Sequence, residues 1–186
     1  MRTSYIFLAE GFEEIEALAT VDVLRRAGLP VKTVSITPLG NVRGAHGVEV
    51  VADCRFDDTD FSDAEWLICP GGLPGSTNLA DFQPLCELLK KHRRGIAAIC
   101  AAPAVVLAPL GLLDGKDATG YPGFEDALEL GGAHVKQGAA VVALDGMITG
   151  AGPAAAVPFA LAIVASTLGK EVAAEIAGGM LLPLAQ

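Results

Sequence analysis

Cys100 is the residue whose neighbours best suit a nucleophile. It ends the apolar run GIAAIC at 95–100, which reads as a buried strand, and a run with helical character, 101–113, follows at once. Small residues surround the cysteine, and Pro103 falls in the first turn of the predicted helix, where a missing N–H costs little. This order of strand, tight turn and helix is typical of a nucleophile elbow. A buried, inert core cysteine fits the same spacing, so both interpretations stay open at this point.

Two backbone features would assist a nucleophile at Cys100. The N-terminus of the following helix should lower the thiol pKa and point N–H groups, including that of Ala101, at an oxyanion. The run CPGGLPG at 69–75 places Gly71 and Gly72 after a second apolar strand, where the backbone can approach a ligand closely. Amides of this turn could complete an oxyanion hole. An ordinary turn also explains the two glycines.

Three glutamates lie at the start of the helix predicted over 13–28. Glu16 can face the carboxyl edge of the sheet near Cys100, although spacing alone does not distinguish it from its neighbours. Glu13 and Glu14 are interpreted as surface residues whose charges complement the positive end of the helix.

The other thiols and the histidines indicate structural roles. No two cysteines form a C-x-x-C pair and no nearby histidine completes a zinc pattern, so neither a metal nor a cofactor is predicted. Cys69 and Cys86 are expected to pack in the core, while Cys54 could be exposed. No histidine gives an obvious pair with Cys100, which argues against papain-like proteolysis. His46, in a glycine-flanked loop, could face a site.

The elements that would position these residues alternate between short apolar runs and helical stretches. Strands are predicted at 5–9, 31–36, 48–53, 66–72 and 95–100, helices at 13–28, 82–94, 101–113, 153–169 and 170–179, and a hairpin around Asp145-Gly146 within 139–150. This pattern favours an α/β fold with one doubly wound, mostly parallel sheet sandwiched by helices. No linker or repeat is visible, so residues 1–186 are expected to form a single domain. The apolar tail 180–186 is expected to pack against the rest.

Charge and hydropathy exclude several classes of partner. The net charge is −9, and the one basic cluster, at 90–94, fits a solvated helix end, so no nucleic acid is expected as a partner. No run reaches the ~18 uncharged apolar residues of a membrane span. The first apolar run is short, meets acidic residues and lacks a cleavage site, so it is interpreted as a strand and not as a signal peptide. The prediction is a cytoplasmic protein without a membrane partner.

Together these segments resemble the DJ-1/ThiJ/PfpI superfamily, which shares the flavodoxin-like fold of class I glutamine amidotransferases. The resemblance covers essentially the whole chain and is closest to the DJ-1/YajL branch. The segments that carry it are GFEEIEALATVDVLRRAG (11–28), PGG (70–72), AAICAAPAVVL (97–107), GPAAAVPFALAIV (152–164) and GKEVAA (169–174).

The resemblance implies a role for several residues. Cys100 matches the easily oxidised elbow cysteine, and Glu16 matches a glutamic acid that stays protonated and donates a hydrogen bond to the thiolate. Gly72 and Ala101 match the backbone donors. Arg26 matches a basic residue near an anion pocket.

Other positions match the family's pocket or depart from it. Gly152 and Pro153 match a turn that lines the site across a dimer interface, since such proteins are commonly homodimers. Tyr121, in TGYPGF, stands where the human-type members carry a histidine beside the cysteine, and it could position a substrate or donate from its hydroxyl. His46 stands where relatives carry a pocket arginine, so an anion site would be weaker or pH-dependent.

Two functions follow from the resemblance. One is the chemistry of a protein deglycase or glutathione-independent glyoxalase (glyoxalase III-like), in which the Cys100 thiolate attacks methylglyoxal-type carbons of a small carbonyl substrate or a glycated adduct. The alternative is an oxidative-stress redox sensor or redox-regulated chaperone that works through oxidation of Cys100. Thiazole monophosphate biosynthesis (ThiJ) and peptidase activity are weaker alternatives. The sequence leaves open whether turnover or redox sensing is the main role.

Overall fold

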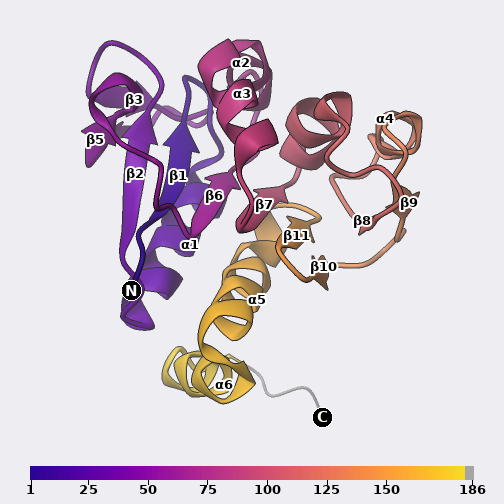
Figure 1. The fold of residues 1–186 in the computed structure, drawn as a ribbon. Coiled ribbons are helices and arrows are strands. Elements are labelled where there is room, and N and C mark those ends of the chain that lie inside the picture. The colour runs from indigo at the N-terminus through magenta and orange to yellow at the C-terminus, as the bar shows by residue number, and fades with distance from the viewer. Residues whose placement is uncertain (183–186) are drawn as a thin grey trace.

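A seven-stranded sheet forms the centre of the computed structural model, which describes residues 1–182 (Figure 1). All neighbouring strands are parallel except the β10–β11 hairpin, which turns at Asp145-Gly146 as predicted. In spatial order the strands are β10 (Val141–Leu144), β11 (Met147–Gly150), β7 (Gly95–Ile99), β6 (Trp66–Cys69), β1 (Ser4–Leu8), β2 (Val31–Ser35) and β5 (Cys54–Arg55).

Helices cover both faces of this sheet. Along β1, Tyr5 and Phe7 point into one core cluster and Ile6 and Leu8 into the other, because successive side chains of a strand point to opposite faces. The Ile6 face is covered by α1 (Glu14–Arg26) and α5 (Ala156–Leu168), and α6 (Lys170–Gly179) packs against α5. The other face is covered by α2 (Gly75–Asp81), α3 (Gln83–Lys91) and α4 (Glu125–Leu130). The predicted doubly wound α/β class is confirmed.

The strand order reverses between β1 and β6. The chain passes from β1 through α1 to β2 on one side, whereas β6 and then β7 lie on the other side of β1. Ligand sites of open α/β sheets lie at such a switch point, beyond the carboxyl ends of the strands. Three segments meet there: the start of α1, the glycine turn after β6, and Cys100 directly after β7.

The strand predicted at 48–53 is not part of the main sheet. Its centre is β4 (Glu49–Val51), which pairs antiparallel with β3 (Asn41–Arg43) in a separate two-stranded sheet. The reason is the turn between them, where Gly47 adopts a φ of 84° and donates its N–H to Gly44. The turn folds β4 back on β3 and leaves the edge of the main sheet to β5.

The helix predicted over 101–113 is helical but not α-helical. It consists of a π-helical turn (Pro103–Leu107) and a 3₁₀ turn (Ala108–Leu110). Two prolines explain this, because Pro103 and Pro109 offer no N–H to a regular ladder. Ala108 bonds instead to the carbonyl of Pro103, five residues back.

Several short elements were not predicted, because they are too short to show a periodic pattern. Among them are α2, α4, β3, β5 and β8 (Asp117–Ala118), which pairs in parallel with β9 (His134–Val135). Of the apolar tail, Met180 packs on the core next to α1 and α5, and residues 183–186 lie outside the described part of the chain. Within residues 1–182, no helix is both long and apolar enough to cross a membrane.

Candidate active site

Cys100 sits in a strained turn directly after β7. Its φ is 66°, a left-handed value that side chains other than glycine rarely adopt, and only 8% of the residue is exposed. Its N–H donates to the carbonyl of Gly150 at 2.9 Å, and its carbonyl accepts from the N–H of Tyr121 at 2.8 Å. The turn therefore holds the sulfur at the carboxyl edge of the sheet, as the elbow pattern predicts.

Glu16 lies beside this thiol, brought there by the first turn of α1. It is fully buried, and its Oε2 accepts the N–H of Gly71 at 2.7 Å. Its other oxygen, Oε1, has no hydrogen-bond partner among the described residues. A buried carboxyl in this state favours its protonated form, because an isolated charge loses its hydration.

Cys100 and Glu16 shift each other's titration. Burial raises the pKa of Glu16 from 4.5 to about 7, although the hydrogen bond from Gly71 lowers it. Burial, followed by the charge of Glu16, raises the pKa of the Cys100 thiol from 9.0 to about 12. The expected lowering of the thiol pKa is therefore wrong, because burial, the larger cause, raises it whether or not Glu16 is ionised. The repulsion disappears when Glu16 takes up a proton, so the thiolate forms most readily beside a neutral Glu16.

Two backbone N–H groups favour the thiolate. Those of Gly72 and Ala101 both lower the pKa of Cys100. Gly72 has a φ of 88°, and a Cβ on it would lie 2.5 Å from both Glu13 N and Gly11 O, so the turn needs glycine here. Gly71 is not a donor of this kind, because its N–H is already bonded to Glu16. Of the three donors proposed for the oxyanion hole, Gly71 is therefore excluded, and the N–H groups of Gly72 and Ala101 remain.

A cavity of about 460 Å³ opens over the sulfur. Tyr121, Phe124 and Pro153 form an apolar part of its wall. Gly152 does not line it but lies under the Tyr121 ring, where a Cβ would come within 3.2 Å of Cδ2. Pro153 reaches the cavity from the same chain as Cys100. The structure therefore brings Tyr121, Gly152 and Pro153 together within one chain, whereas the resemblance implied that Gly152 and Pro153 line the site across a dimer interface. Sequence reasoning missed Phe124, Ile15 and Leu73, whose apolar side chains carry no chemical signal.

The cavity rim holds a polar cluster that the sequence did not reveal. His46 reaches it from the turn between β3 and β4, and its Nδ1 lies 3.0 Å from Glu14 Oε2 and 3.5 Å from Glu13 Oε2. The interpretation of Glu13 and Glu14 as surface residues is wrong, because at most 8% of the surface of each whole residue is exposed. The β3–β4 hairpin covers them.

Arg26 does not belong to the pocket of its own chain. It lies at the last turn of α1, and a rise of about 1.5 Å per residue places it about 15 Å along the helix from Glu16. Its Nε donates to Asp22 at 2.7 Å on the exposed face. The expectation that Arg26 lies near an anion pocket is therefore wrong within one chain.

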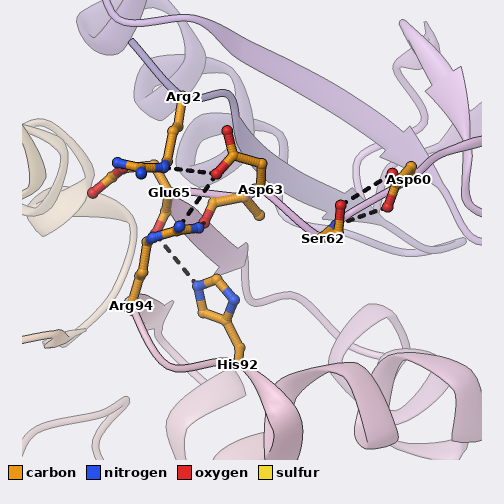
Figure 2. Close-up of polar contacts among 8 residues, drawn as sticks. Arg2, Asp60, Ser62, Asp63, Glu65, His92 and Arg94 are labelled. Carbon is orange, nitrogen blue, oxygen red and sulfur yellow. Dashed lines mark hydrogen bonds and ion pairs between the residues drawn. The ribbon is translucent and has the colours of Figure 1, made fainter.

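A second hollow, of about 480 Å³, lies at the amino edge of the sheet, and no cysteine lines it among the described residues. Figure 2 shows the network beside it, in which Arg2 and Arg94 converge on Asp63 at 2.7 and 3.2 Å. Nε2 of His92 lies 3.4 Å from the carbonyl of Glu65. These contacts tie β6, β7 and the N-terminus together, so Arg94, the last residue of the basic cluster at 90–94, has a structural role.

The fold and the site match proteins of one family. A statistical description of the DJ-1/PfpI family matches residues 2–166. The chain belongs to the DJ-1/PfpI family. Among DJ-1/PfpI proteins, it is 36% identical to the Parkinson disease protein 7 homolog of Danio rerio, over 97% of each chain.

Other family members extend the comparison. The solved structure described as oxidized Toxoplasma gondii DJ-1 superposes with a TM-score of 0.93 at 35% identity, covering 99% of this chain and 100% of that one. DJ-1 homolog A of Arabidopsis thaliana is 37% identical over 97% of this chain, but the chain spans only 47% of that relative's length.

Proposed function

We propose that this protein uses Cys100 to act on reactive carbonyl compounds, in the manner of a protein deglycase or glutathione-independent glyoxalase. The observation that carries the proposal is the setting of the sulfur. Two backbone N–H groups, of Gly72 and Ala101, favour its anionic form. A buried carboxyl lies beside it, and one oxygen of that carboxyl has no hydrogen-bond partner within residues 1–182. The cavity above it has room for a small aldehyde.

The geometry supports a definite first step. The Cys100 thiolate adds to the aldehyde carbon, forming a C–S bond while the electrons of the C=O bond move onto oxygen. That oxygen lies next to the N–H groups of Gly72 and Ala101, which stabilise the developing charge. Glu16 then gives its proton to the oxygen and becomes the base for the next transfer. The Cys100 thiolate and the Glu16 carboxyl are therefore both needed for this step, one as the nucleophile and the other as the proton donor.

Lactate formation from methylglyoxal tests this proposal. Cys100→Ser is expected to abolish it, while Cys54→Ser, which alters a thiol remote from the pocket, leaves it unchanged. Equal lactate formation by wild type and Cys100→Ser, or no turnover above a heat-treated control, contradicts the proposal.

Glu16→Gln separates the two roles given to the carboxyl. Glutamine can accept the Gly71 N–H and donate to the sulfur, but it cannot transfer a proton. We expect the variant to keep alkylation of Cys100 by iodoacetamide and to lose most of its turnover. Unchanged turnover would remove Glu16 from the proton-transfer step.

A second function, redox sensing, is favoured by the free oxygen of Glu16. Peroxide transfers oxygen to the Cys100 thiolate and leaves as water, and a second peroxide gives the sulfinate. A protonated Glu16 Oε1 could donate to that product. Peptide mass spectrometry after mild peroxide should find two added oxygens on Cys100 in preference to the other thiols. Equal oxidation of all four cysteines contradicts it.

We also propose a cytoplasmic homodimer. Ile15 and Leu18 project from α1 with 57% and 38% of their surface exposed, which a second copy could cover. Light scattering on a size-exclusion column measures the mass, and a monomer at micromolar concentration contradicts the dimer.

A further inference from the structure

We propose that Glu13, Glu14 and His46 form a binding site for a divalent transition-metal ion at the rim of the Cys100 cavity. The three side chains offer two carboxylate oxygens and one imidazole nitrogen, all within 4.8 Å of one another. The proposal is independent of the function of Cys100, because it rests on the ligand set alone. Sequence reasoning predicted no metal, since it looked for cysteine-based patterns and these ligands lie far apart in the chain.

The spacing of the three atoms fits a common ion. Zinc binds carboxylate oxygen and histidine nitrogen at about 2.0–2.2 Å, so adjacent ligands lie about 3.0 Å apart in an octahedron and about 3.4 Å apart in a tetrahedron. The Nδ1 of His46 lies 3.0 Å from Glu14 Oε2 and 3.5 Å from Glu13 Oε2. Both nitrogen–oxygen distances therefore fit one shared ion, and the two carboxylate oxygens lie within 4.8 Å of each other.

The loop between β3 and β4 fixes Glu14 in the ligating position. Its Oε1 accepts the N–H of His46 at 2.8 Å and that of Val48 at 3.2 Å, which leaves Oε2 to face the other ligands. Gly44 has no room for a side chain, because a Cβ there would collide with the Glu14 carboxylate. The loop is thus shaped around the carboxylate of Glu14.

Glu13 supplies an independent reason to expect a cation. Its side chain is 10% exposed, and Oε1 receives the Ile15 N–H at 3.5 Å. Its Oε2 accepts no hydrogen bond within residues 1–182 and points at the cluster. The Glu14 side chain beside it is 9% exposed. Two carboxylates this deeply buried need positive charge, and His46 is the one basic side chain that contacts both of them in the described part of the chain.

The types of ligand indicate the class of ion. Their place at the cavity rim indicates the direction in which the open coordination positions of the ion face. Carboxylates suit Mn²⁺ and imidazole suits Zn²⁺ or Fe²⁺, whereas soft Cu(I) prefers thiolates. Three protein ligands leave coordination positions for water or substrate oxygen. Because Glu13 and His46 also line the cavity over Cys100, those positions are expected to face the same space.

Titration of the full-length protein with Mn²⁺ alone, followed by electron paramagnetic resonance, tests the site. Wild type should bind one ion per chain. Losing even an outer partner of a metal ligand costs about 10- to 100-fold in affinity, so His46→Ala should weaken binding by at least about tenfold. His134→Ala is the matched control, because that histidine is equally exposed and lies 3.6 Å from the carboxylate of Asp117. It should leave the affinity unchanged.

Two further variants decide between a metal and its alternatives. Cys100→Ser should retain full Mn²⁺ affinity, and a loss there would assign the ion to the thiol and overturn the proposal. His46→Arg supplies positive charge without a ligand, so it should abolish Mn²⁺ binding while the melting temperature stays at or above that of wild type. Equal affinity in wild type and His46→Ala, or no saturable binding by wild type, means that His46 only pairs with the carboxylates and overturns the proposal.

Discussion

The backbone N–H of Gly71 donates a hydrogen bond to Oε2 of Glu16 at 2.7 Å and so holds the carboxyl beside the Cys100 thiol. The glycine also fills the narrow gap between the two reactive groups. A Cβ at this position would lie 2.5 Å from the Cβ of Cys100 and 2.6 Å from Glu16 Oε2. Distances this short leave no space for any side chain, so the contact between thiol and carboxyl depends on a residue with no side chain of its own.

Gly71→Ala is therefore expected to disrupt the site. Forcing one methyl group into a packed interior costs about 1–3 kcal/mol, and here it must displace Glu16 or Cys100. Urea unfolding should show this loss of stability, and iodoacetamide should modify Cys100 more slowly. Gly40→Ala is the control, because a Cβ there meets no atom of the described residues within 4 Å. Similar stability and alkylation in the two variants would contradict the close contact.

Glu16 should make the folded state less stable as pH rises. Its pKa is raised from 4.5 to about 7, so the folded protein holds this proton more tightly than the unfolded chain. Stability from this group is then complete below about pH 4.5 and is lost as pH rises to about 7, by an amount on the order of 3 kcal/mol. Urea unfolding of wild type and Glu16→Gln across this window measures it. A constant difference between the two proteins would show that Glu16 does not titrate there.

The four thiols should differ in reactivity. Cys69 is fully buried, so a reagent cannot reach its sulfur and it should resist alkylation in the native state. Cys86 is buried as well, and burial raises its pKa. Cys54 is partly exposed, and Cys100 opens onto the cavity. Iodoacetamide followed by peptide mass spectrometry should label Cys54 and Cys100 first. Early labelling of Cys69 would contradict the packing of β6.

Tyr121 is expected to act through its ring. Tyr121→Ala removes part of the cavity wall but keeps the backbone N–H that holds the carbonyl of Cys100, so KM should rise about tenfold with little change in kcat. Tyr121→Phe should leave both constants near those of wild type. A loss of kcat in Tyr121→Phe would instead make the hydroxyl a proton donor. Steady-state kinetics with methylglyoxal distinguishes these outcomes.

The sequence predicted those parts of the site that depend on local order. The run GIAAIC followed by Pro103 is enough to place Cys100 at a turn, because strand, turn and helix signals lie within a few residues. The same holds for Gly72 and the β10–β11 hairpin. The extent of the domain over 1–186 stays a prediction.

Contacts between distant segments were not predictable. The burial of Glu13 and Glu14 depends on a hairpin centred some thirty positions later, and nothing near them in the sequence marks it. Which glycine bonds to Glu16 depends on how β6 ends relative to α1. The misplacement of Arg26 was avoidable, because the regular rise of a helix already separates it from Glu16.

The two hydrogen bonds that hold the peptide groups of Cys100 come from segments that also shape the cavity. Tyr121 binds the carbonyl and forms a wall, while Gly150 binds the N–H two residues before the turn that carries Gly152 and Pro153. A change in the backbone of either segment that widens the cavity for a larger ligand would also shift the sulfur. Selection for a new ligand and preservation of reactivity therefore act on the same few residues. Side-chain exchanges that leave these backbones in place are the route by which specificity could diverge.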